Sequence, residues 1–136
     1  MANYEPFVRS NYFQVLDPAA FRSWCAERGL EVIDDEDPVH GTLYGFIADD
    51  GIPDDRLDDE TDEYVEIDFY AELAAHLVTG WIAVVREIGY EKMRYLTGYT
   101  VAVDHAGETI TLNLDDIYAL AKKQWGEEVN CTCCEY

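Results

Sequence analysis

Apolar and polar side chains alternate along several short segments of the chain, and a period of two is typical of strands. In the first half of the chain, strands are predicted at residues 10–16 (SNYFQVL), 30–33 (LEVI) and 42–48 (TLYGFIA). An acidic cluster at 34–37 and Pro38 separate the second strand from the third. These breaks predict separate short strands.

The period of two returns near the end of the chain, in segments rich in β-branched and aromatic residues. Strands are predicted there at residues 81–88, 92–103 and 108–114. The connections between these three strands are short, so we expect an antiparallel three-stranded C-terminal meander.

Three other segments place apolar residues on one face of a helix. The first begins with Asp17 as N-cap and Pro18 in its first turn, and the second spans 69–79 after Asp68. The third follows Asn113 or Asp115 and stops before Gly126. The sequence therefore predicts one α+β domain over residues 1–126, with about three helices packed on one face of a mainly antiparallel sheet.

The net charge of the chain limits the kinds of molecule that the protein can bind. The chain has 29 Asp and Glu against 9 Lys and Arg, a formal net charge of −20 over 136 residues. Such a field repels phosphates and attracts basic surfaces, so direct binding to nucleic acid or to an anionic membrane is not expected. B-form DNA carries one charge per about 1.7 Å of axis, so this charge corresponds to roughly ten base pairs.

Composition favours a folded protein, most simply one in the cytoplasm. Apolar residues make up 49% of the chain and aromatic residues 13%, too much for an acidic disordered tail. The first ten residues lack the apolar core of a signal peptide, and no apolar run approaches the roughly 18 residues of a membrane span.

The stretch 49–68, DDGIPDDRLDDETDEYVEID, contains eleven carboxylates and one cation, Arg56. An EF-hand does not fit, because a loop starting at Asp54 puts Arg56 at a ligand position and Asp59 where glycine is needed. A solvated acidic loop at about 49–66 remains the simple alternative. The charge of the whole chain favours presentation to a basic partner, for which the candidate residues are Asp49, Asp50, Asp54, Asp55, Asp58, Asp59, Glu60, Asp62 and Glu63.

The sequence gives little support for a catalytic function. His76 lies in the second predicted helix and is expected to be a half-buried packing residue, while His40 and His105 fall in loops. No nucleophile elbow, phosphate-binding glycine loop or zinc-protease motif is present. We therefore expect a protein that is not an enzyme and has no cofactor.

Residues 127–136 form a cysteine-rich tail. Cys131, Cys133 and Cys134 are weak candidates for binding zinc or copper, because the usual C-x₂-C pair is absent and a fourth ligand would have to come from elsewhere. A frayed, reduced tail is the favoured interpretation.

Several segments resemble a family of small acidic proteins of bacterial phages, plasmids and integrative elements. They are SNYFQVLDPAAFRSW, LYGF, IDFYAELAAHLVTGWIAVV, EKMRYLTGYTVAV and LDDIYALAK, within residues 9–126. The resemblance implies an accessory protein of a mobile element, of the anti-restriction or anti-CRISPR kind. The cysteine-rich tail departs from the family pattern.

Charge and resemblance together give the leading hypothesis, an inhibitor that mimics DNA and binds the basic nucleic-acid-binding surface of a host defence effector complex. An immunity protein that neutralises a basic nuclease toxin is the first alternative. A small metal-binding protein is the second.

Overall fold

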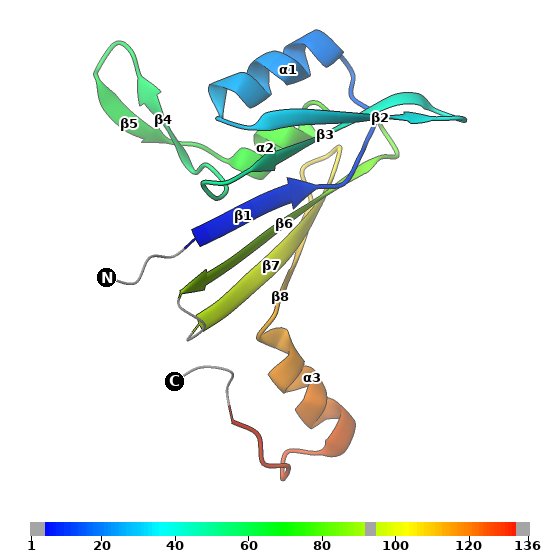
Figure 1. Cartoon of the computed structure of the whole chain (residues 1–136), viewed down its shortest axis with the longest axis vertical. Coiled ribbons are helices and arrows are strands. Elements are labelled where there is room, and N and C mark those ends of the chain that lie inside the picture. Colours follow the sequence, from blue (N-terminus) through cyan, green and yellow to red (C-terminus); the bar gives the residue numbers. More distant parts are fainter. Residues whose placement is uncertain (1–4, 92–94, 133–136) are drawn as a thin grey trace.

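A computed structural model describes residues 5–91 and 95–132 and contains one six-stranded antiparallel sheet, a separate two-stranded hairpin and three helices (Figure 1). The large sheet has the order β2-β3-β1-β6-β7-β8. Its strands are β1 (Glu5–Ser10), β2 (Glu31–Asp37), β3 (Gly41–Ala48), β6 (Ile82–Glu91), β7 (Tyr95–Asp104) and β8 (Thr109–Asn113). The α+β class with a mainly antiparallel sheet is thus confirmed.

The helices are α1 (Pro18–Glu27), α2 (Phe69–Ala74) and α3 (Asp116–Trp125). Asp17 caps α1 as its sequence predicts, with its carboxylate accepting hydrogen bonds from the backbone N–H of Ala19 and Ala20. Within the described residues, no helix is long and apolar enough to cross a bilayer.

The core lies between one face of the large sheet and the helices α1 and α2. Aromatic side chains fill it, and Phe13, Phe21 and Phe46 are fully buried there beside Val85 of β6. Phe13 meets Phe21 edge to face, with ring centroids 5.7 Å apart. These rings fix α1 and α2 against the sheet, because large buried aromatic side chains dominate the packing energy of a small domain.

The strand predicted at residues 10–16 was placed wrongly. The strand β1 ends at Ser10, and the residues that follow make only isolated bridges, from Phe13 to Tyr44 and from Val15 to Leu77. The alternation seen in the sequence reflects burial of Phe13 and Val15 as the chain crosses from the sheet to the helices. The predicted helix 69–79 is likewise shorter, because the chain after Ala75 pairs with the segment around Val15.

The sequence predicts that the acids at 34–37 separate two strands. In the structure they belong to β2. Each pairs with a residue of β3, from Asp34 opposite Tyr44 to Asp37 opposite Gly41. At the end of this hairpin, the Asp37 carboxylate accepts a hydrogen bond from the backbone N–H of His40 and contacts its Nδ1 at 2.6 Å. Charged residues on an edge strand prevent pairing with other chains, which gives these acids a structural role.

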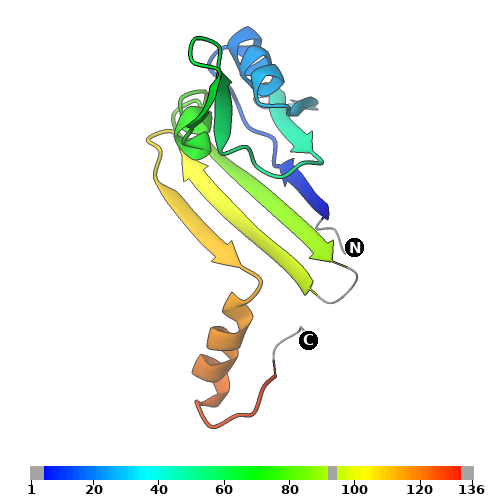
Figure 2. The ribbon, with the colours of Figure 1, turned by 90° about the vertical axis from the view of Figure 1, so that its left-hand side faces the viewer.

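The third helix does not share a face with the others. It has no buried residue and lies beyond the end of β8, away from α1 and α2 (Figures 1 and 2). The expectation that about three helices pack on one face therefore fails for α3. The chain direction is fixed where β8 ends, because Leu114 N–H bonds to the Gly98 carbonyl and Ile117 N–H bonds to the Leu114 carbonyl.

Candidate functional site

Negative charge is concentrated in one half of the chain. Residues 31–72 contain 17 of the 29 acids and only one of the nine Lys and Arg, so they carry −16 of the net −20. These residues form β2, β3, the two-stranded hairpin and α2, which gather in the upper part of Figure 1. The rest of the chain carries only −4, so the molecule has a strongly acidic end.

The centre of this acidic end is a hairpin of β4 (Asp55–Asp58) and β5 (Glu63–Glu66), which we call the acidic hairpin. Its turn is closed by the Asp62 N–H bonding to the Asp58 carbonyl at 2.8 Å, and the Asp58 carboxylate accepts from the Glu60 N–H at 3.0 Å. Asp62 has a left-handed backbone with φ of 60°, a conformation that aspartate tolerates better than most side chains. Local turn chemistry therefore shapes the hairpin.

The sequence predicts a loop at about 49–66, and the structure places a hairpin within that stretch. Of the nine candidates, Asp49, Asp50 and Asp54 lie in the segment that leads to β4, while the turn holds Asp59, Glu60 and Asp62. The strands themselves hold Asp55, Asp58 and Glu63. The hairpin was missed because Asp and Glu are poor strand formers and mask the short apolar pair Leu57 and Tyr64.

The strand register sets carboxylates directly opposite one another. Asp55 faces Glu66, and Asp58 faces Glu63. Like charges in this position destabilise a two-stranded sheet, because opposite Cβ atoms lie only about 4.5–5.5 Å apart. A hairpin of this kind is already only marginally stable. The opposed charges therefore weaken the ladder, while the Asp58 carboxylate also helps to close the turn.

Most of the candidate carboxylates have no internal partner. Within the described residues, no hydrogen bond or ion pair is made by the side chains of Asp49, Asp50, Asp54, Asp55, Asp59, Glu60, Asp62 and Glu63. All of these residues are exposed. Their oxygens are free to accept hydrogen bonds from cationic groups of another molecule.

Exposed apolar side chains stand between the acids of the hairpin. Tyr64 is 73% exposed and Leu57, its partner across the ladder, is 47% exposed. Val65 lies opposite Arg56 on the other face. Tyrosine is enriched at protein interfaces and often anchors them, so the exposed Tyr64 suits contact with another protein.

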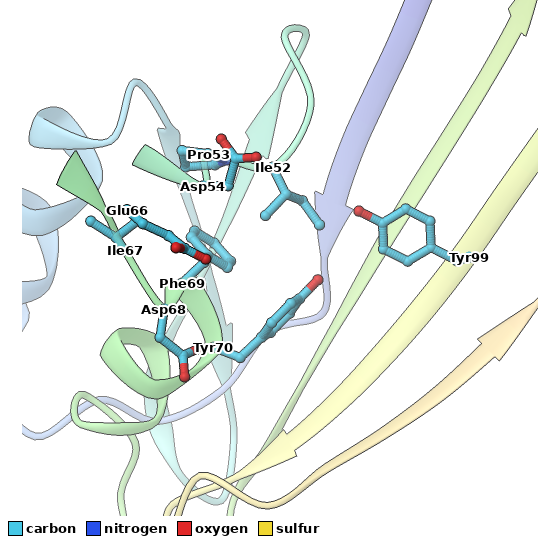
Figure 3. Close-up of a pocket in the computed structure, with 9 residues that line it drawn as sticks. All are labelled: Ile52, Pro53, Asp54, Glu66, Ile67, Asp68, Phe69, Tyr70 and Tyr99. Atoms are coloured by element: carbon cyan, nitrogen blue, oxygen red, sulfur yellow. The ribbon is translucent and has the colours of Figure 1, made fainter. Parts of the chain in front are cut away.

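A cleft of about 610 Å³ opens at the base of the acidic hairpin. Three carboxylate residues, Asp54, Glu66 and Asp68, lie along it, and Tyr70 and Tyr99 lie on another side (Figure 3). The hydroxyl groups of both tyrosines point into the space between their rings (Figure 3). Burial raises the pKa of Tyr70, so this side chain remains a neutral phenol. The cleft thus combines negative charge with aromatic surface.

The base of the hairpin is held by the fold on both sides. Before β4, the Glu87 carboxylate of β6 accepts from the Ile52 N–H at 2.9 Å, and after β5, the Ile67 N–H bonds to the Asp54 carbonyl. Asp68 caps α2 by accepting from the Ala71 N–H at 3.1 Å. The hairpin is therefore a projecting arm on a fixed base.

Next to this base, a charged contact joins α1 to α2. Glu72 accepts two hydrogen bonds from the Arg28 guanidinium, at 2.8 and 3.1 Å, and one from Trp24 Nε1 at 2.9 Å. The bond from Arg28 lowers the pKa of Glu72, so this acid is ionised and occupied. Glu72 belongs to the support of the hairpin and not to its exposed charge.

The remaining candidates from the sequence are scattered. His76 is half-buried, with its ring 5.8 Å from that of Phe21 and 5.2 Å from that of Trp24, as expected for a packing residue. Burial lowers its pKa. His40 contacts Trp81 and Asp37. His105 is exposed in the turn after β7.

The structure describes one of the three weak metal candidates. Cys131 is exposed with a free thiol, while Cys133 and Cys134 lie outside the described residues. Cys25 is buried in the core, where desolvation raises the pKa of its thiol to about 12. Within the described part of the chain, no group of three or more His, Cys, Asp or Glu side chains is placed to hold a metal ion.

No family model, curated protein or solved structure matches this chain. The resemblance to acidic proteins of mobile elements therefore stays a prediction. The features of the molecule that bear on function are the acidic hairpin and the cleft at its base.

Proposed function

We propose that the protein inhibits a nucleic-acid-targeting defence effector of a bacterial host by placing the acidic hairpin in the basic groove that receives DNA. The observation that carries this proposal is the set of exposed hairpin carboxylates that have no partner among the described residues. Asp55 and Glu63 belong to this set, and each also faces another acid across the strands. Acids that weaken the fold are retained because they contact a cationic partner.

Runs of consecutive acids support DNA mimicry. Every residue is acidic at 54–55, where the chain enters β4, and at 58–60, where β4 passes into the turn. Each strand of B-DNA likewise carries one charge on every successive unit, one phosphate per about 3.4 Å of axis. Carboxylates stand in for phosphate oxygens and accept charge-assisted hydrogen bonds from Arg and Lys.

The cleft gives the contact a point of specificity. A guanidinium group from the partner fits between the carboxylates of Asp54 and Glu66 and the ring of Tyr70, because it pairs with acids and stacks on aromatic faces. Tyr64 at 73% exposure supplies apolar contact at the projecting end. The phosphate backbone of DNA offers no such aromatic contacts, so the inhibitor gains affinity beyond charge.

The proposal is tested by phage plating on bacteria that carry a defined CRISPR effector or restriction enzyme. Expression of the protein should restore plaque formation on a host whose defence it blocks. A variant with Asp55→Asn, Asp59→Asn, Asp62→Asn and Glu63→Gln should fail to restore it, because it removes four charges while keeping side-chain shape. Asn also tolerates the left-handed backbone at position 62.

A matched control removes four exposed acids outside residues 31–72, through Glu27→Gln, Glu108→Gln, Glu127→Gln and Glu128→Gln. It should inhibit like the unchanged protein. Equal loss in both variants would mean that total charge matters and the hairpin does not. Full inhibition by the hairpin variant, with circular dichroism showing both variants folded, would remove the hairpin from the interface.

A further inference from the structure

The face of the large sheet opposite α1 and α2, which we call the outer sheet face, is apolar and uncovered. Strand register places these side chains together, since residues directly opposite in a ladder point to the same face. Its large apolar members are between 49% and 74% exposed: Phe7, Ile82, Ile88, Leu96, Ile110 and Leu112. In an antiparallel sheet with one face in water, the side chains on that face are mostly polar. Most of the large side chains on the outer sheet face are apolar instead.

The helix α3 carries a second uncovered apolar surface. Ile117, Leu120 and Trp125 repeat at helical spacing and are 59%, 53% and 71% exposed. A ten-residue helix is too short to be stable in water without packing its apolar side against something. Its own sheet does not provide that support, because α3 points away from it (Figure 2).

The two apolar surfaces adjoin each other at the end of β8. A Cβ atom added at Gly98 would lie 3.0 Å from Leu114 and 3.4 Å from Ile88, so Leu114 sits on the outer sheet face beside Ile88. The chain therefore leaves the sheet on that face. The carbonyl of Gly98 and the Asp116 carboxylate, which accepts from the Asn113 N–H at 2.6 Å, then hold α3 in its outward direction.

Charge also separates this region from the acidic end. Residues 109–126 contain two acids and two lysines and are neutral, in a chain of net charge −20. On the outer sheet face, Arg9 and Arg86 lie directly opposite each other and border a cleft of about 340 Å³. Two like charges in register repel each other, so acids from a partner would stabilise them, and α3 carries Asp115 and Asp116 at its start.

The two edges of the sheet differ in a way that points to the same region. The edge strand β2 carries the acids at 34–37, whereas β8 (TITLN) has no charged residue and all five of its side chains are exposed. An uncharged edge strand is normally covered by another element. A helix laid across β8 and the outer sheet face would cover it.

We infer that the protein forms a two-fold symmetric dimer in which α3 of each copy packs on the outer sheet face of the other. The partner is a second copy because one chain carries both complementary surfaces, an apolar helix flanked by acids and an apolar sheet with two arginines. The nine apolar side chains expose roughly 100 Å² each, and the resulting 900 Å² or so matches the ~800 Å² per partner of a stable interface. The acidic end stays free.

Analytical ultracentrifugation in reducing buffer tests the dimer, with the cysteines kept from cross-linking. The expected species has twice the 15.5 kDa mass of the chain. Ile110→Lys on the sheet and Leu120→Lys on α3 should each weaken the dimer about thirtyfold or more, since each breaks both copies of the contact. Val39→Lys, at an apolar residue 82% exposed in the β2–β3 turn, is the matched control and should leave the dimer intact.

Mixing the two variants distinguishes this arrangement from other dimers. An Ile110→Lys copy keeps a natural α3, and a Leu120→Lys copy keeps a natural outer sheet face, so the mixture regains one unaltered contact. We expect dimers in the mixture at concentrations where each variant alone is a monomer and circular dichroism shows both folded. A monomeric natural protein at high micromolar concentration would overturn the inference, as would a dimer that survives both substitutions.

Discussion

Relieving the like-charge pairs of the acidic hairpin should stabilise it while weakening its function. The substitutions Asp55→Asn and Glu63→Gln remove one carboxylate from each of the two opposed pairs, Asp55 with Glu66 and Asp58 with Glu63. Neither replaced side chain makes an internal hydrogen bond or ion pair among the described residues. The loss of repulsion is therefore the main change within the fold.

The size of the effect follows from Coulomb's law. Two unit charges about 5 Å apart in water repel by about 0.8 kcal/mol, and screening at 0.1 M salt reduces this to about 0.5 kcal/mol. This value lies within the range of 0.2–1 kcal/mol that is typical of cross-strand pairs. Two pairs give about 1 kcal/mol, which is about a fivefold change in the opening equilibrium of the hairpin.

Hydrogen exchange of a peptide covering residues 54–67 measures that opening. Each exchange rate is divided by the rate of the same peptide in its unfolded state. The normalised rate should be about fivefold slower in the double variant than in the natural protein at 0.1 M salt. The difference should fade at 1 M salt, where the screening length is about 3 Å. As a control, Asp59→Asn with Asp62→Asn removes two turn charges that have no partner across the ladder.

An unchanged exchange rate in the double variant would refute the repulsion between strands. So would an equal gain in the control, because the effect would then come from overall charge. If the double variant gains stability but keeps full inhibition, the two acids repel their partners across the strands as proposed. They would then not contribute to inhibition.

Four further predictions concern the fold that supports the hairpin and the response of the protein to divalent cations. Gly45→Ala should lower the free energy of unfolding by about 1–3 kcal/mol in urea titration, because its methyl group would lie 2.5 Å from the Asn11 carbonyl oxygen. Glu72→Leu should lower it by about 2–3 kcal/mol, since Arg28 and Trp24 lose their acceptor. In the natural protein, the contribution of Glu72 should persist above about pH 4.5 and be lost as pH falls through its lowered folded pKa, a dependence that Glu72→Gln should lack. Millimolar Ca²⁺ or Mg²⁺ should raise the melting temperature no more than monovalent salt of equal ionic strength, and a saturable, cation-specific rise in calorimetry would contradict this.

The sequence predicted those parts of the fold that depend on local signals. The Asp17 cap and the first helix both follow from residue type and spacing. The strand at 10–16 was misplaced because Phe13 and Val15 alternate for a tertiary reason, burial on two sides of a crossing segment. Alternation alone does not distinguish such a segment from a ladder.

The strands in the acidic segments could not be predicted from local signals. The acids at 34–37 extend β2 because β3 supplies a complete set of pairing groups, and no local pattern records the partner strand. The β4–β5 hairpin was hidden for the same reason, although its position between Pro53 and Asp68 could have signalled a bounded unit. The candidate acids could be chosen from composition, but their opposition across a ladder required the strand register.

The most direct measurement of the central claim is a mobility-shift competition with the effector that the plating assay identifies, loaded with its guide where it uses one, and its target DNA. Carboxylates of the hairpin and phosphates of the DNA compete for the same cationic groups, so binding should be mutually exclusive. The affinity of the protein should also fall as salt rises, and the control variant should compete like the natural protein. A ternary complex of effector, DNA and this protein would contradict DNA mimicry.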